Sequence, residues 1–212
     1  MKTDDLIDML ARGPAPDPAP PAARLALMAG AGLVASAALM LALLGINPRL
    51  AAFAVMPAFW VKVGFVLALA AGGCSAVARL SRPGRSMAGL PLALALPWLV
   101  IAALAVVVLL PAEAPERTAL ILGSSWRVCP FNIAFLSLPL FASFVAIMRT
   151  LAPTRLRLAG AATGFAAGAV AACVYCVHCP EIAAPFVGIW YSLGMLIPTA
   201  VGAALGPRLL RW

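Results

Sequence analysis

Residues 25–45 read LALMAGAGLVASAALMLALLG, an apolar run that has the full length of a membrane span. About 18 or more apolar residues are long enough to cross the hydrocarbon layer as a helix. Further runs of this kind follow along the chain, and we place the spans at approximately 25–45, 58–78, 88–110, 131–148, 158–177 and 183–206. The sequence therefore predicts an all-α fold, a six-helix transmembrane bundle.

The composition of the whole chain agrees with this class. Hydrophobic residues make up 64% of the 212 residues and charged residues only 10%, and the mean hydropathy is +1.05. A soluble domain of this length needs far more charge on its surface. The first apolar run is a full span that follows a polar and proline-rich segment, so it does not have the pattern of a signal peptide.

The basic residues predict the orientation in the bilayer. Eleven of the fifteen Lys and Arg residues fall in the two terminal regions and in the second and fourth connections between spans. The positive-inside rule then places both termini in the cytoplasm. The net charge of +8 is therefore read as an orientation signal. Because the basic residues form no continuous patch, we expect no direct binding of nucleic acid.

The spans carry almost no ionisable side chains. No Asp or Glu falls in the middle of a span, and Lys62 is the one basic residue that could lie inside one. We expect Lys62 to lie near the outer end of its span and to extend its ammonium to the membrane surface. Ion and proton pathways normally need ionisable groups within the membrane, so this pattern argues against secondary transport.

Small residues in the fifth span predict close helix packing. Gly160, Gly164 and Gly168 form a G-x-x-x-G-x-x-x-G series. Such a series lets the backbones of two membrane helices approach closely.

Three of the five cysteines gather near the predicted outer surface, where a disulfide can persist. The run CVYCVHCPE at 173–181 also contains the single histidine, His178. One interpretation is a zinc site, with the ligands Cys129, Cys176, His178 and Cys179. The other is a disulfide that joins Cys129 to Cys179 or to Cys176. Cys74 and Cys173 are expected to be packing residues.

Two further function classes fit this patch less well. The motif CVHC at a helix end has the local appearance of a membrane thiol oxidoreductase, since His178 and a helix terminus can lower a thiol pKa. Such an enzyme relays electrons through a second external cysteine pair, and only Cys129 is available. A metal permease that uses the patch as an entry site is disfavoured by the apolar spans. We therefore expect neither enzyme activity nor a small-molecule substrate.

The first twelve residues, MKTDDLIDMLAR, predict a short amphipathic helix. Thr3 can cap this helix, and Asp4 and Asp5 complement its N-terminus. Its apolar residues are Leu6, Ile7, Met9 and Leu10. So short a helix is unstable alone in water, so we expect it either to fold in the groove of a partner or to fray. Residues 13–24 form a proline-rich linker to the membrane domain at 25–212, stiff enough to hold the helix roughly 30 Å off the bilayer.

Several motifs together resemble the NrsF family of membrane anti-sigma factors. They are MKTDDLIDMLA at the N-terminus, GSSWRVCPFNI at 123–133, HCPE at 178–181 and FVGIWYSLGMLIPTAVGAALGPRLLRW at 186–212. The resemblance covers the whole chain. It implies a protein that holds an extracytoplasmic-function sigma factor at the inner face of the bacterial inner membrane.

The resemblance also implies roles for particular residues. The sigma-binding N-terminus of the family corresponds here to Thr3, Asp4, Leu6, Ile7 and Leu10, and we include Asp5 and Met9 of the same predicted helix. The two external signal-sensing cysteines of the family correspond to Cys129 and Cys179, with Cys176 and His178 as neighbouring candidates. Metal or oxidative stress would change the state of these groups and release the sigma factor. Whether the patch forms a disulfide or binds a metal stays open at this point.

Overall fold

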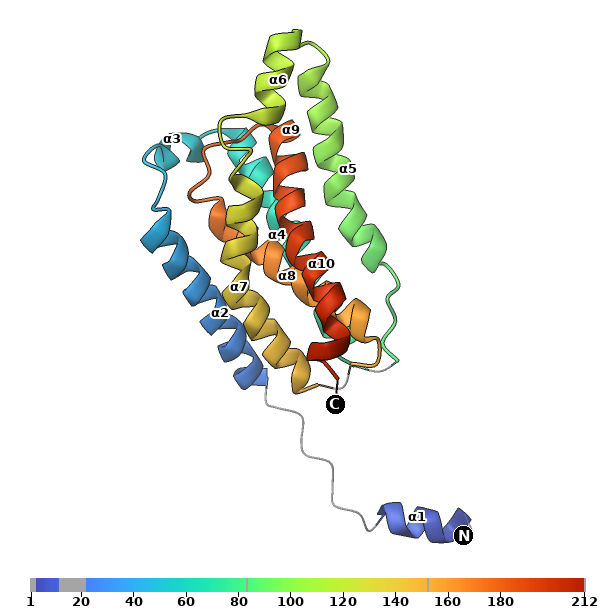
Figure 1. The fold of residues 1–212 in the computed structure, drawn as a ribbon. Helices are drawn as coiled ribbons and strands as arrows, with labels where there is room; N and C mark the ends of the chain where they lie inside the picture. Colours follow the sequence, from blue (N-terminus) through green and yellow to red (C-terminus); the bar gives the residue numbers. More distant parts are fainter. Residues whose placement is uncertain (1–2, 12–21, 83, 152, 212) are drawn as a thin grey trace.

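The computed structural model describes residues 3–11, 22–82, 84–151 and 153–211, and every regular element in these ranges is helical (Figure 1). The elements are α1 (Thr3–Ala11), α2 (Ala22–Leu43), α3 (Leu50–Ala54), α4 (Pro57–Leu80), α5 (Leu90–Leu109), α6 (Ala114–Leu122), α7 (Cys129–Arg149), α8 (Leu156–Tyr175), α9 (Ala184–Phe186), the π-helix η1 (Val187–Tyr191) and α10 (Ser192–Leu209). The prediction of an all-α fold is confirmed.

Six of the described helical segments are long and apolar enough to cross a membrane. They are Ala23–Leu43, Pro57–Leu80, Leu90–Leu109, Cys129–Arg149, Leu156–Tyr175 and Ala184–Leu209. Each coincides with one of the predicted spans to within a few residues. The last segment is continuous through α9, η1 and α10, because the π-helix replaces an α-helical turn without breaking the rod.

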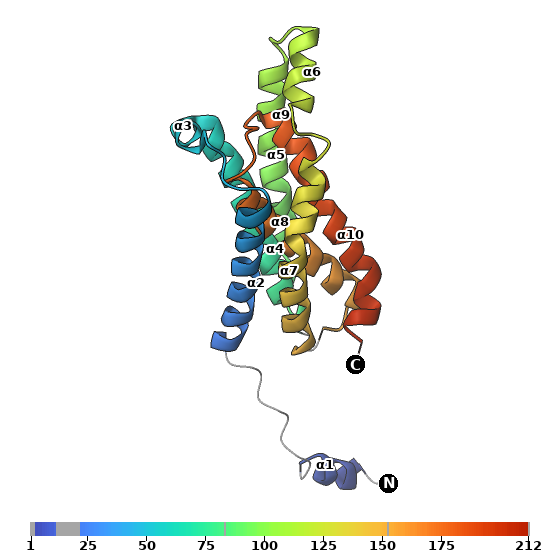
Figure 2. The ribbon, with the colours of Figure 1, turned by 60° about the vertical axis from the view of Figure 1, so that its left-hand side comes forward.

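The connections between these helices separate into two groups at opposite ends of the bundle (Figures 1 and 2). The start of α2, the α4–α5 and α7–α8 connections and the end of α10 lie at one end. The short helices α3 and α6 and the segment between α8 and α9 lie at the other. The arginine-rich α4–α5 and α7–α8 connections therefore lie at the same end of the bundle as the start of α2 and the end of α10.

The helix α8 lies at the centre of the bundle and packs against α10, α4 and α7. Its glycines make the contact with α10 possible. A Cβ on Gly164 would overlap the carbonyl oxygen of Pro198, and a Cβ on Gly160 would overlap that of Gly202. A Cβ on Gly168 would approach backbone atoms of α10 as well. The close packing predicted from the glycine series is confirmed.

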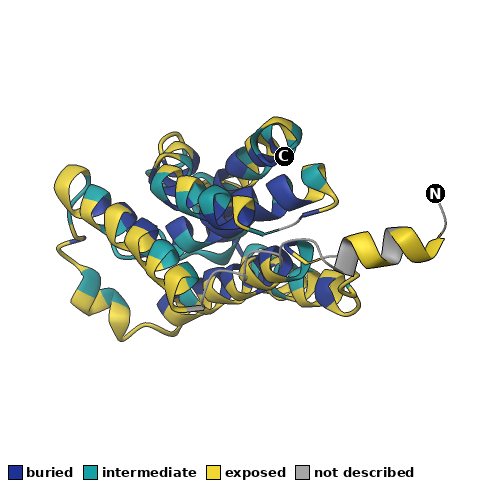
Figure 3. Ribbon diagram, turned by 90° about the horizontal axis from the view of Figure 1, so that it is seen from below, coloured by how far each residue is buried: buried dark blue, intermediate teal, exposed yellow. Residues whose placement is uncertain are grey.

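The outer surface of the bundle is apolar, as expected for helices that face lipid. Buried residues line the interior sides of the helices and exposed residues the outer sides (Figure 3). Large hydrophobic side chains such as Leu92, Leu99 and Val107 of α5 are more than half exposed. In water such a surface would cost free energy, whereas in hydrocarbon it does not.

Candidate functional site

Two cysteines from different parts of the chain meet at the end of the bundle that carries α3 and α6. Cys129 is the first residue of α7, and Cys179 lies in the segment that follows α8. Their side chains are fully buried, with 0% and 1% of the surface exposed. The two thiols lie close enough to act on each other's pKa, and they are not joined by a disulfide. The structure therefore brings together the two cysteines that the sequence singled out.

Short backbone turns position both sulfurs. The N–H of Cys129 donates to the carbonyl of Ser125 at 2.9 Å, and Pro130 occupies the first turn of α7, where its missing N–H leaves no bond unmade. The N–H of Cys179 donates to the carbonyl of Tyr175 at 3.0 Å, which adds one more turn at the end of α8. Each cysteine is thus held by the terminus of a long, packed helix.

Lys62 of α4 lies directly beside this pair. The expectation that its ammonium reaches the membrane surface is wrong, because only 1% of the residue is exposed. Its Nζ instead donates to the carbonyl of Cys179 at 2.9 Å and to that of Glu181 at 3.0 Å. The rings of Phe59 and Tyr191 lie 5.4 and 5.8 Å from the same nitrogen. These contacts tie the cysteine-bearing segment to α4 and place a positive charge beside the sulfurs.

The surroundings of the pair favour a thiolate on Cys179. The hydrogen bond from Cys129 lowers the pKa of Cys179 to about 6, and the charge of Lys62 acts in the same direction, whereas burial opposes both. Burial raises the pKa of the neighbouring Cys176 to about 11, so that thiol keeps its proton at neutral pH. Because the thiolate is the reactive form of cysteine, these surroundings favour Cys179 over Cys176 as the more reactive thiol.

A carboxylate joins the two loops that carry the cysteines. Oε1 of Glu181 accepts hydrogen bonds from the backbone N–H of Ser124 at 2.8 Å and from its hydroxyl at 2.6 Å. Gly123 beside it has a φ of +55°, and a Cβ there would lie 2.7 Å from the Glu181 carboxylate. The indole N–H of Trp190 donates to the carbonyl of Ile121 at 2.8 Å and fastens the end of α6, just before this loop, to the last apolar helical segment. Hydrogen bonds therefore hold the segments that carry Cys129 and Cys179 together.

The predicted four-ligand zinc site receives no support from this geometry. Nδ1 of His178 lies 3.0 Å from the carbonyl oxygen of Gly45, so the imidazole contacts the α2–α3 connection. Within the part of the chain that the structure describes, no group of three or more His, Cys, Asp and Glu side chains is placed to hold a metal ion. The pair Cys129 and Cys179 is retained as the candidate site, while Cys176 and His178 lie beside it. Cys74 is exposed and Cys173 is half-buried, and both belong to other parts of their helices.

The predicted N-terminal helix is present as α1. Asp4 and Asp5 lie in its first turn, and the residues Thr3, Asp4, Asp5 and Met9 are exposed. The side chains of Leu6, Ile7 and Leu10, which complete the predicted binding face, lie outside the described residues, as does most of the linker at 13–24. A partner-binding role for this segment stays a prediction.

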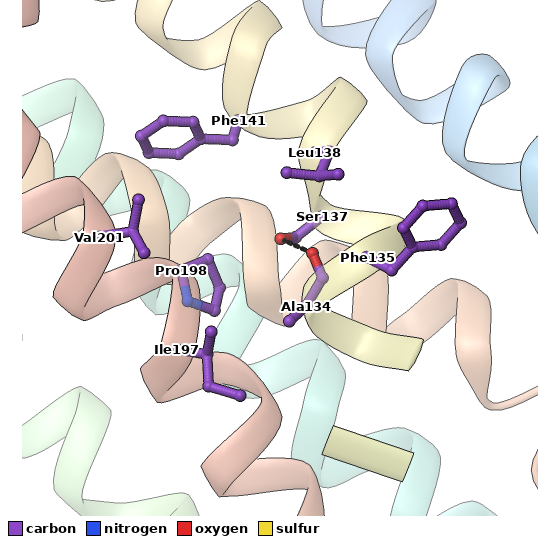
Figure 4. A pocket seen from close by; sticks show the side chains of 8 residues that line it. All are labelled: Ala134, Phe135, Ser137, Leu138, Phe141, Ile197, Pro198 and Val201. Carbon is purple, nitrogen blue, oxygen red and sulfur yellow. Dashed lines mark hydrogen bonds between the residues drawn. The ribbon is translucent and has the colours of Figure 1, made fainter. Parts of the chain in front are cut away.

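A hollow between α7 and α10 lacks the features of a substrate site (Figure 4). It has a volume of about 250 Å³ and is lined by Ala134, Phe135, Ser137, Leu138, Phe141, Ile197, Pro198 and Val201. The hydroxyl of Ser137 donates to the carbonyl of Ala134 at 2.6 Å, which directs it away from a ligand. Substrate sites normally combine an apolar wall with a few convergent polar groups, and the side chains lining this hollow do not provide them.

Sequence reasoning missed Lys62 as a member of the site and missed the role of Glu181. A signal for Lys62 was present, because an ionisable residue inside a span is a functional candidate by default. Glu181 stands within the same HCPE motif as Cys179. The partners of both residues lie far away along the chain, and the sequence could not show these contacts. They follow only from the packing of α4, α7 and α8.

Comparison with known proteins gives full-length matches. A family model described as "NrsF: Negative regulator of sigma F" matches residues 10–212. The chain is 55% identical over 213 residues to the "Probable anti-sigma-F factor NrsF" of Azospira oryzae and 43% identical over 223 residues to the "Anti-sigma-F factor NrsF" of Caulobacter vibrioides. Both alignments cover 100% of this chain and 100% of the relative. No solved structure is matched.

Proposed function

The chain belongs to the NrsF family of negative regulators of sigma F, and from this premise we propose that it is a membrane anti-sigma factor that binds sigma F through α1 and releases it when the Cys129–Cys179 pair is oxidised. The full-length identity to two anti-sigma-F factors is the observation that carries the first half of this proposal. The family is regulatory rather than enzymatic, which removes the thiol oxidoreductase interpretation.

The orientation in the membrane is part of the proposal. The arginine-rich end of the bundle faces the cytoplasm of a bacterial inner membrane, with both termini on that side. The residues Arg79, Arg82, Arg85, Arg149 and Arg155 belong to this end. The thiol pair then lies at the opposite, periplasmic end, where no cytosolic reductant acts on it. Sigma F, a cytoplasmic protein in this scheme, meets α1 on the inner side.

The chemistry of sensing follows from the two unequal sulfurs. The Cys179 thiolate attacks a two-electron oxidant such as a peroxide, cleaves its O–O bond and becomes a sulfenic acid, while the departing oxygen takes up a proton to leave as an alcohol or as water. The Cys129 sulfur then attacks the sulfenic sulfur, a disulfide forms, and water leaves with the sulfenic oxygen. Two thiols have lost two electrons to the oxidant. Cys129 and Cys179 would also supply two thiolate ligands to a soft metal ion, and its binding would be the metal-stress form of the same signal.

Burial gives this reaction its selectivity. Both sulfurs are shielded from solvent, so a small oxidant reaches them more readily than a large thiol reagent or a reductase does. Formation of the disulfide removes the hydrogen bond between the sulfurs and the negative charge next to Lys62. Since Lys62 also holds the carbonyls of Cys179 and Glu181, the change is transmitted to α4 as well as to α7.

Co-purification tests the anti-sigma function. The full chain and a variant that lacks residues 1–12 are purified from detergent-solubilised membranes, and their bound proteins are identified by mass spectrometry. We expect sigma F with the full chain and its absence with the truncated chain. Absence of sigma F from both samples, with the membrane domain intact, would contradict the proposal.

A cysteine variant tests the sensing function separately. Cys129→Ser should retain sigma F and abolish its release by oxidant, whereas Cys173→Ser, a change at a half-buried thiol outside the pair, should leave release intact. A normal oxidant response in Cys129→Ser would remove the thiol switch and leave the anti-sigma function untouched.

A further inference from the structure

An open groove lies at the end of the bundle opposite the thiol pair. The helices α2, α4 and α7 enclose it, and its volume is about 610 Å³. Its apolar wall includes Leu25, Phe144 and Ile147, and its rim carries Arg79, Arg82 and Arg85. An apolar groove with three guanidinium groups on one rim fits an amphipathic segment that is acidic on one side and aliphatic on the other.

The geometry points to α1 of the same chain as the segment that docks in this groove. Its sequence, TDDLIDMLA, supplies three aspartates together with Leu6, Ile7 and Leu10, which lie within about one helical turn of one another. The aspartates complement the arginines of the rim, and the aliphatic residues match the apolar wall. The charges of the segment and those of the groove are therefore opposite.

The length of the connection permits this contact. Residues 12–21 separate α1 from α2, and at ~3.1 Å per residue they can span about 30 Å. Leu25, a wall residue, lies in the first turn of α2, so the groove begins where the connection ends. The connection therefore keeps α1 within reach of the groove.

The aspartates of α1 favour binding in the groove over binding elsewhere on the membrane surface. A helix with three carboxylates is repelled by an anionic leaflet, since binding at such a surface depends on basic side chains. The arginines at the rim remove this repulsion locally. Arg79 is held in place by bonds to the carbonyls of Ser86 at 3.2 Å and Ala88 at 2.8 Å. Arg82 and Arg85 are exposed and remain for the incoming carboxylates.

The groove shares two of its walls with the thiol site. The helix α4 carries Lys62 near one end and Arg79 at the other, and α7 begins with Cys129 and ends beside Phe144 and Ile147. A shift of either helix at the thiol pair therefore changes the width of the groove. When α1 lies in the groove, its binding face is covered and sigma F is released. This competition rests on the proposed function, whereas the docking of α1 does not.

Photo-crosslinking tests the docking. A benzophenone amino acid replaces Met9 of α1, which is 60% exposed, so that all five cysteines stay intact. The full chain is placed in nanodiscs of zwitterionic lipid, with a parallel sample that contains anionic phospholipid. Adducts are mapped by mass spectrometry in the reduced and the peroxide-treated protein. We expect them on residues 25–29, 74–82 and 144–151, with a higher yield after oxidation.

Charge reversal supplies the control. Arg82→Glu with Arg85→Glu should lower the adduct yield at least about tenfold, because like charges then face each other, and Asp4→Lys, Asp5→Lys and Asp8→Lys together should restore it. Arg157→Glu, at an exposed arginine of the same end outside the groove, should have no effect. Adducts that are insensitive to these reversals, that spread over other surfaces, or that form with phospholipid alone would overturn the docking of α1.

Added sigma F separates the two parts of the inference. If it lowers the adduct yield, docking and sigma binding compete for α1. If the groove adducts form but sigma F leaves them unchanged, the docking stands and the competition is overturned.

Discussion

Lys62→Met should reduce the reactivity of Cys179. Methionine is close to lysine in length and removes both the charge and the donors, while Lys62→Arg keeps them. Since the ammonium of Lys62 lies beside the Cys179 sulfur and favours its thiolate, the pKa of Cys179 should rise in the methionine variant. The measurement is the rate of alkylation of Cys179 by iodoacetamide as a function of pH, read from the Cys179 peptide by mass spectrometry.

The size of the effect follows from the pKa of about 6. Loss of a nearby opposite charge raises a pKa by about 1 to 3, and we take the lower end because the hydrogen bond from Cys129 is the larger influence. At pH 6 the thiolate fraction then falls from about one half to about one in eleven. Alkylation should slow about fivefold at pH 6 and about twofold at pH 7, because only the thiolate reacts.

The same pKa gives a dependence of stability on pH. The folded pKa of Cys179 lies below its unfolded value, so the thiolate contributes stability that is lost as the pH falls through about 6. Raising the pH from 6 to 7 should therefore add about 1 kcal/mol to the free energy of unfolding of the native chain, and less than half of that to the free energy of unfolding of Lys62→Met. Thermal unfolding in detergent measures both.

Two results would refute this reasoning. An unchanged pH profile of alkylation in Lys62→Met would show that the ammonium does not act on the sulfur. Equal shifts in Lys62→Met and Lys62→Arg would show that side-chain packing, and not the charge, is responsible. The arginine variant therefore has to resemble the native chain.

Three further changes have definite expected outcomes. Gly164→Ala should lower the free energy of unfolding by about 1–3 kcal/mol, because the new Cβ would overlap the backbone of α10. Gly30→Ala, which has open space around the new Cβ, should not lower it. Thermal unfolding compares the two variants. Glu181→Gln should loosen the loop at Ser124 by replacing charge-assisted hydrogen bonds with weaker ones, seen as faster proteolysis there; an unaltered rate would refute the clamp. Leu6→Asp should activate a sigma F-dependent promoter without stress, measured by a reporter with the membrane level of the protein checked by immunoblot.

The cysteine site shows how far sequence reasoning reached. The motifs WRVCP and HCPE identify Cys129 and Cys179 through a family resemblance, and the structure places the two sulfurs in contact. The zinc interpretation depended on His178 turning toward the sulfurs, and its imidazole contacts Gly45 instead. Spacing along a chain places residues on one helix face, but it does not say which way a side chain turns in the loop that follows.

The environment of Lys62 could not be predicted from the sequence. Its position one turn inside a span fits either a side chain that extends to the surface or one that is buried, and the choice depends on what the neighbouring helices offer. The structure offers two carbonyls, from Cys179 and Glu181, and two aromatic rings. These compensate for removing the charge from water.

The sequence by itself determined the six long apolar helices, the grouping of the arginine-rich connections and the capacity of the fifth of these helices for close packing. Each of these is a local property, because a membrane helix satisfies its own backbone hydrogen bonds and needs only a sufficient apolar length. Tertiary structure alone decided that Lys62 of α4 lies beside Cys179, and that Arg82 and Arg85 border a groove with α2 and α7. Those contacts depend on how each helix is rotated and tilted. Spans that are apolar on every side do not encode that rotation, so it is set by the packing of the whole bundle.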